Sequence, residues 1–159
     1  MIDKIILATL FLSFFSHADN IDEQNQWYQA KNGMYVIRDT INDGYVATLE
    51  QSKNGTLNIY IQYVDIDGCK NKDGISGTHD PLYVNGVLVK FAQACNNEWR
   101  TFYPISQEGS NYIIKEFINK SNVEIMTYNK DFKLLFSANG FSKIYNKKQT
   151  QLTAERNAI

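Results

Sequence analysis

The acidic, glycine-rich run YVDIDGCKNKDGISGTHD, positions 63–80, is the segment of this sequence most suggestive of chemistry. Its aspartates supply the carboxylate oxygens that calcium prefers as ligands. An EF-hand loop starting at Asp65 requires an oxygen ligand at its fifth position, glycine at its sixth and glutamate at its twelfth. Those positions hold Cys69, Lys70 and Ser76. The run therefore predicts a long, turn-rich surface loop without a metal ion, and an irregular calcium site is the alternative.

Catalytic groups are scarce in the rest of the chain. The only histidine after position 18 is His79, in the run GTHDP, and three consecutive residues cannot form a catalytic triad. We find no G-x-S-x-G elbow, glycine-rich phosphate loop or H-E-x-x-H motif. Glu98 with Asp65 or Asp67 could form a glycosidase-like carboxylate pair, so a small hydrolase stays an alternative. The sequence predicts no catalytic residue, no cofactor and no enzymatic activity.

The chain has two cysteines, Cys69 and Cys95. In an oxidising compartment two lone cysteines most often form a disulfide. A metal site would need three or four ligands, and a catalytic thiolate would need a histidine base, for which His79 is the one candidate. We predict a Cys69–Cys95 disulfide that ties the 63–80 loop to a strand ending at Cys95.

A cluster of aromatic and basic residues follows the second cysteine in the run EWRTFYP, positions 98–104. Tryptophan, tyrosine and arginine are enriched at binding hot spots. Strand alternation places Trp99 and Tyr103 on one face and Arg100 on the other, so one of these faces is expected to be core. The candidate partner-binding residues are Asp65, Asp67, Asp73, His79, Trp99, Arg100 and Tyr103.

The N-terminal run MIDKIILATLFLSFFSHADN has the pattern of a signal peptide. Lys4 gives a positive start, an apolar run covers 5–15, and SHA at 16–18 is a small-x-small cleavage site. The apolar run is too short to span a membrane, and no other long apolar stretch follows. We therefore expect residues 1–18 to be removed and the protein to be periplasmic or secreted.

Beyond residue 33 apolar and polar residues mostly alternate, which predicts β-strands. Asn85-Gly86 suits a type I′ turn that pairs Val84 with Val87 and Leu82 with Val89. The predicted strands and hairpins cover 34–40, 44–51, 56–64, 82–95, 98–104, 122–129 and 131–139.

Two segments instead carry helical spacing. Ser110 could cap a short helix over 110–120, and the apolar residues after Gly140 predict a C-terminal helix. The chain is thus expected to be mainly β, an antiparallel β-sandwich or barrel of about eight strands with one short helix and a C-terminal helix. The predicted organisation is a polar leader at 19–32, a single domain at 33–152 and a frayed tail at 153–159.

A resemblance to a known family covers residues 80–148. The order YVNGVLVKFAQAC, GSNYIIKEFINKSNVEIMTYN and LLFSANGFSKIYN resembles the C-terminal half of the invasion-associated locus B family. Cys95 matches a family cysteine, and Ser137, Gly140 and Phe141 match its closing S-x-x-GF motif, although the family usually has a further cysteine soon after the first. The resemblance implies a β-sandwich exported to the bacterial envelope, without a defined catalytic activity.

The formal net charge of −1 gives no electrostatic reason to expect binding to nucleic acid. The function that the sequence favours is an exported binding module, such as an inhibitor or immunity-type protein, whose partner is another envelope or secreted protein. Acidic residues beside aromatic ones suit a basic partner such as a cationic cell-wall hydrolase. The alternatives are a structural envelope or virulence-associated protein, as the family resemblance implies, and the small hydrolase.

Overall fold

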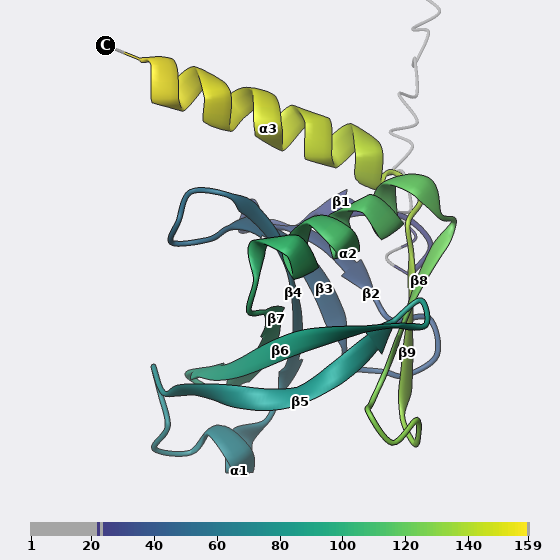
Figure 1. The fold of residues 1–159 in the computed structure, drawn as a ribbon. Helices are drawn as coiled ribbons and strands as arrows, with labels where there is room; N and C mark the ends of the chain where they lie inside the picture. The colour runs from purple at the N-terminus through teal and green to yellow at the C-terminus, as the bar shows by residue number, and fades with distance from the viewer. Residues whose placement is uncertain (1–21, 23, 159) are drawn as a thin grey trace, which may run out of the picture.

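A computed structural model describes residue 22 and residues 24–158 of the chain, so the predicted signal peptide lies outside the described residues. The strands form a single nine-stranded antiparallel sheet, in the order β1-β2-β3-β4-β7-β6-β5-β8-β9, which curls into an incomplete barrel (Figure 1). The predicted mainly β, antiparallel fold is confirmed, and the sheet has the form of an incomplete barrel.

The strands are β1 Tyr28–Gln29, β2 Tyr35–Arg38, β3 Val46–Gln51, β4 Leu57–Val64, β5 Ser76–Val84, β6 Val87–Asn96, β7 Trp99–Pro104, β8 Asn122–Met126 and β9 Lys133–Ser137. The helices are α1 Ile66–Cys69, α2 Gln107–Asn119 and α3 Phe141–Asn157. None of the helices in the described part of the chain is long and apolar enough to cross a membrane.

The β5–β6 hairpin has the predicted register. Val84 pairs with Val87 and Leu82 pairs with Val89. The turn residues Asn85 and Gly86 have φ angles of 45° and 83°, as a type I′ turn requires. However, β5 already begins at Ser76 and α1 forms from Ile66, so the prediction of one long loop over 63–80 was wrong. The polar start of β5 is held by its pairing with β6, which overrides its low intrinsic strand propensity.

Hydrogen bonds outside the strand ladders join the two edges of the curled sheet. Strand β1 pairs only with the first half of β2, and the chain just after β2 reaches β9. The backbone N–H of Thr40 donates to the carbonyl of Leu135 (2.9 Å), and the N–H of Leu135 donates to the buried carboxylate of Asp39 (2.6 Å). That carboxylate also accepts from the N–H of Asn42 at 2.5 Å. Asp39 therefore helps to close the barrel.

Helix α2 packs one face on the curled sheet, where it contacts β4, β7 and β8. Ile113 and Phe117 are fully buried there. The helix begins after Ser106, whose hydroxyl accepts from the N–H of Gly109, so the prediction that Ser110 caps it was wrong. Ser110 lies inside the first turns and donates to the carbonyl of Ser106. Serine favours the N-cap of a helix at either position, so the local sequence does not distinguish Ser106 from Ser110. The packing of α2 sets the start of the helix at Ser106.

The predicted leader and tail both belong in part to the folded unit. Trp27 is buried, with its ring 5.4 Å from Phe117 and 5.0 Å from Phe141. Its indole N–H donates to the carbonyl of Ser137. Helix α3 continues through Asn157, so most of the segment predicted to fray is helical. The Ser137 and Phe141 side chains, which match the closing family motif, thus lie where the N-terminal segment packs on β9 and α3.

Candidate functional site

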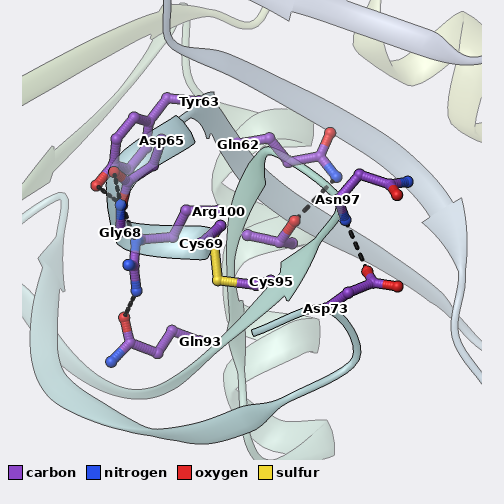
Figure 2. The surroundings of a disulfide bond; sticks show 11 residues. Gln62, Tyr63, Asp65, Gly68, Cys69, Asp73, Gln93, Cys95, Asn97 and Arg100 are labelled. Carbon is purple, nitrogen blue, oxygen red and sulfur yellow. Dashed lines mark hydrogen bonds and ion pairs between the residues drawn. A yellow bond between two sulfur atoms is a disulfide. The ribbon is translucent and has the colours of Figure 1, made fainter. Parts of the chain in front are cut away.

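The disulfide predicted from the sequence is present between Cys69 and Cys95 (Figure 2). Its Cα atoms lie 5.4 Å apart, and both residues are buried. It joins the one-turn helix α1 to the end of β6. A backbone hydrogen bond from Gly74 to the carbonyl of Cys95 adds to this connection. The loop between β4 and β5 is therefore held against the sheet by covalent and hydrogen bonds.

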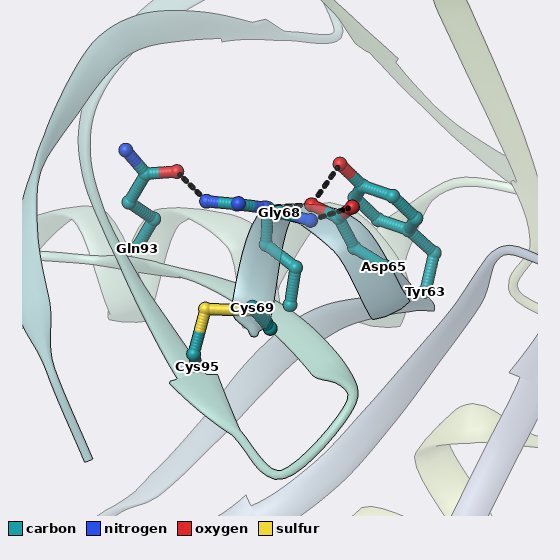
Figure 3. Close-up of polar contacts among 7 residues, drawn as sticks. Tyr63, Asp65, Gly68, Cys69, Gln93 and Cys95 are labelled. Carbon is teal, nitrogen blue, oxygen red and sulfur yellow. Dashed lines mark hydrogen bonds and ion pairs between the residues drawn. A yellow bond between two sulfur atoms is a disulfide. The ribbon is translucent and has the colours of Figure 1, made fainter. Parts of the chain in front are cut away.

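Asp65 and Arg100 form the polar support of this loop (Figure 3). Asp65 caps α1 by accepting from the N–H of Gly68 (3.0 Å), and it accepts from Arg100 Nε (2.6 Å). Arg100 also donates to Gln93 at 2.8 Å. A side chain at Gly68 would collide with the Asp65 carboxylate, so the pair needs glycine there. Asp65 and Arg100 were both predicted to bind a partner. In the structure their polar atoms instead bond to each other and to neighbouring residues of the same chain.

This ion pair makes a testable contribution to acid stability. The hydrogen bond from Arg100, followed by that from the N–H of Gly68, holds the pKa of Asp65 below its ordinary value of 3.8. A carboxylate whose pKa is lower in the folded state stabilises the protein above its unfolded pKa, and this contribution is lost as the pH falls through the folded pKa. Wild type should therefore lose stability relative to Asp65→Asn as the pH is lowered from about 4, measured by urea unfolding at several pH values.

The exposed Asp43→Asn substitution is the matched control, and it should leave the wild-type pH profile unchanged. Parallel profiles of wild type and Asp65→Asn below pH 4 would contradict the assigned role of the ion pair.

Beside the disulfide lies an open groove of about 690 Å³, called here the disulfide groove. Its apolar wall includes Trp99, which is 41% exposed, and Ile66, which is 58% exposed. The charged lining residues are Asp67, Asp73, Glu98 and Lys70. Three carboxylates against one ammonium group make this lining acidic.

The carboxylates of the groove differ in whether they form hydrogen bonds within the chain. Asp73 accepts from the N–H of Asn97 (2.7 Å) and so holds the β6–β7 turn (Figure 2). Asp67 and Glu98 are exposed, and within the described residues neither side chain has a recorded hydrogen bond or ion pair. Asp67, Asp73 and Trp99 are the predicted site residues that the structure brings together in one groove.

The structure places the remaining two predicted site residues elsewhere. Tyr103, near the other end of β7, packs against Tyr60 with ring centroids 6.0 Å apart. His79 faces Phe102 at 4.7 Å, and its Nδ1 donates to the carbonyl of Asp80. Neither residue lines the disulfide groove.

Sequence reasoning missed an apolar cavity in the barrel, called here the barrel cavity. It has a volume of about 120 Å³, and its floor is formed by Ile61, Leu82, Ile125 and Leu134. Its aromatic rim contains Tyr45, Tyr63, His79, Phe102 and Phe132. Five strands and two connections supply these side chains, so no short motif could have revealed the cavity.

The pKa values of the two rim tyrosines are raised. Burial raises the pKa of the Tyr45 hydroxyl above its ordinary value, and the negative charges of Asp39 and Asp65 add to the shift. Burial is also the main reason that the pKa of Tyr63 is raised. The Tyr63 hydroxyl donates to Asp65 at 3.4 Å, which links the rim of the barrel cavity to the ion pair beside the disulfide (Figure 3).

Within the described residues, no group of three or more histidine, cysteine, aspartate or glutamate side chains is arranged to hold a metal ion. No family model, curated protein or solved structure matches this chain. The resemblance to the invasion-associated locus B family therefore stays a prediction.

Proposed function

We propose that this chain is an exported, non-enzymatic binding module that holds a basic protein of the cell envelope or its surroundings in the disulfide groove. The observation that carries the proposal is the exposed Trp99 and Ile66 pair beside the free carboxylates of Asp67 and Glu98. Tryptophan is one of the residue types enriched at protein-binding hot spots, and the acidic groups beside it favour a basic partner. An inhibitor or immunity-type protein is the kind of module that such a site suits.

An exposed apolar side chain of β4 lies next to Trp99, beside the groove. Val64 pairs across the sheet with Trp99 and is 47% exposed, so three large apolar side chains lie together at the surface. Contiguous exposed apolar area is a common property of interaction surfaces. These side chains would supply most of the affinity, because tryptophan and aliphatic groups release water when a partner covers them.

The acidic side chains would orient the partner and increase the rate at which it associates. Two free carboxylates attract a positively charged partner, and this attraction weakens as salt screens it. The disulfide and the Asp65–Arg100 ion pair already order the groove, so little conformational entropy is lost when a partner binds. A basic secreted protein, such as a cationic cell-wall hydrolase, has the matching charge.

Trp99→Ala should weaken binding by about 10- to 100-fold, because it removes the central apolar contact. The double variant Asp67→Asn/Glu98→Gln should weaken it less, and mainly at low salt. The test is a pull-down from envelope extract, followed by affinity measurements on the purified retained protein at two salt concentrations. Asp65 and Asp73 are left unchanged because both support the loop.

The double variant Asp43→Asn/Glu155→Gln is the matched control, since it makes the same change of charge at exposed positions away from the groove. It should bind like wild type. If Trp99→Ala keeps the wild-type melting temperature and retains the same partner with unchanged affinity, the disulfide groove is not the binding site.

A further inference from the structure

The barrel cavity is a hollow with an apolar floor. Its floor consists of Ile61, Leu82, Ile125 and Leu134, each of which is at most 7% exposed. Helix α2, which packs on the same sheet, contributes no residue to its lining. A ligand that occupies this hollow would cover apolar floor atoms and gain dispersion contacts with them.

The size of the cavity limits the ligand to a single ring. Its volume is about 120 Å³. An engineered protein cavity of about 150 Å³, lined by leucine, isoleucine and phenylalanine, binds benzene. A fused ring system or an acyl chain would be too large to enter completely, whereas one six-membered ring would fill the space.

The arrangement of the rim favours an aromatic ring. Tyr45 lies 4.9 Å from Tyr63 and 5.4 Å from Phe132, measured between ring centroids. Phe102 continues the series, 6.0 Å from Tyr63 and 4.7 Å from His79. These rings form a continuous series within the lining, and a bound ring can meet them in the geometry that aromatic pairs prefer.

The polar groups of the lining favour a neutral ligand. Tyr63 donates to Asp65, and His79 donates to the carbonyl of Asp80. The hydroxyl of Thr127 donates to Asp131 and accepts from the N–H of Phe132. The nearby cation, Arg100, is bound to Asp65 and Gln93. The charged groups nearest the lining, Asp65 and Arg100, are thus paired with each other, so a charged ligand would lose hydration on the apolar floor without gaining an unpaired counter-charge.

We propose that the barrel cavity is a binding site for a small, neutral, monocyclic aromatic molecule such as a phenol. The ring enters between the rim aromatics and rests on the aliphatic floor, and a hydroxyl substituent remains at the solvent-facing opening. This site is separate from the disulfide groove and does not depend on the function proposed for the groove.

The test is a titration of the purified, methyl-labelled protein with p-cresol, followed by NMR. The methyl signals of Leu82, Ile125 and Leu134 should shift in a saturable manner, with a dissociation constant of about 0.1–1 mM. Cyclohexanol should bind about 3- to 10-fold more weakly because it lacks the ring contacts, and benzoate should bind at least about 10-fold more weakly because it is charged. Equal binding of either comparator would overturn the proposed ligand class.

Leu82→Phe should abolish binding because the larger side chain fills the cavity. Leu88→Phe is the matched control, since Leu88 is 45% exposed on the same hairpin, and it should bind like wild type. Should Leu82→Phe not fold, nuclear Overhauser effects between p-cresol and the floor methyl groups of wild type decide the question. Their absence, or binding that persists in folded Leu82→Phe, would overturn the proposal.

Discussion

Replacing Cys69 and Cys95 together by alanine lowers the free energy of unfolding by about 3–4 kcal/mol, the expected result for a disulfide that closes a loop of this length. The bridge spans a sequence separation of 26 residues, and its removal gives the unfolded chain more conformations. Both cysteines are buried, so the lost packing adds to the effect. Urea unfolding followed by tryptophan fluorescence and circular dichroism measures the change.

Wild type in a reducing agent is the control for this experiment, and it should unfold at nearly the same urea concentration as the double variant. The variant should also bind the partner of the disulfide groove more weakly, because the loop that carries Ile66 and Asp67 is no longer tied to β6. Coinciding urea midpoints for oxidised wild type and the variant would show that the bridge contributes nothing to stability.

Asp39→Ala should cost about 3 kcal/mol of unfolding free energy. The Asp39 carboxylate is 1% exposed and accepts hydrogen bonds from the backbone of Asn42 and Leu135. Alanine leaves both donors without this acceptor, and hydrogen bonds to charged groups contribute about 1.5–3 kcal/mol each, with incomplete additivity. The substitution should also loosen the junction between β2 and β9, which faster amide hydrogen exchange at Thr40 and Leu135 would detect.

Asp43→Ala is the matched control, because Asp43 is an exposed aspartate in the same connection between β2 and β3. It should change the unfolding free energy by no more than about 0.5 kcal/mol. Asp39→Asn should fall between the two variants, since its amide keeps one acceptor oxygen. Equal stability of Asp39→Ala and Asp43→Ala would refute the role of Asp39 in closing the barrel.

The sequence alone determined those features that depend on local physical chemistry. A type I′ turn requires positive φ angles at its two central residues, which Asn85 and Gly86 tolerate, and this turn sets the register of the β5–β6 hairpin. The alternation of apolar and polar residues predicted most of the strands, and therefore the mainly β fold. Two cysteines without other ligands were sufficient to predict the disulfide.

The role of each site residue depended on contacts that sequence spacing does not specify. Asp65 and Asp67 are two positions apart, yet one binds Arg100 and the other is exposed in the disulfide groove. The prediction treated them alike because both stand in the same acidic run. Their difference follows from the pairing of β4 with β7, which places Arg100 opposite Tyr63 and within reach of Asp65 alone.

Only the tertiary structure decided that the sheet curls into one barrel and leaves a cavity inside it. The curl depends on bonds between segments far apart in the sequence, such as those from Asp39 and Thr40 to Leu135. It brings together the rim residues Tyr45, Phe102 and Phe132, which come from three separate regions of the chain. Strand alternation indicates which side chains face inward, but the space left between them is set by how the strands and α2 pack together.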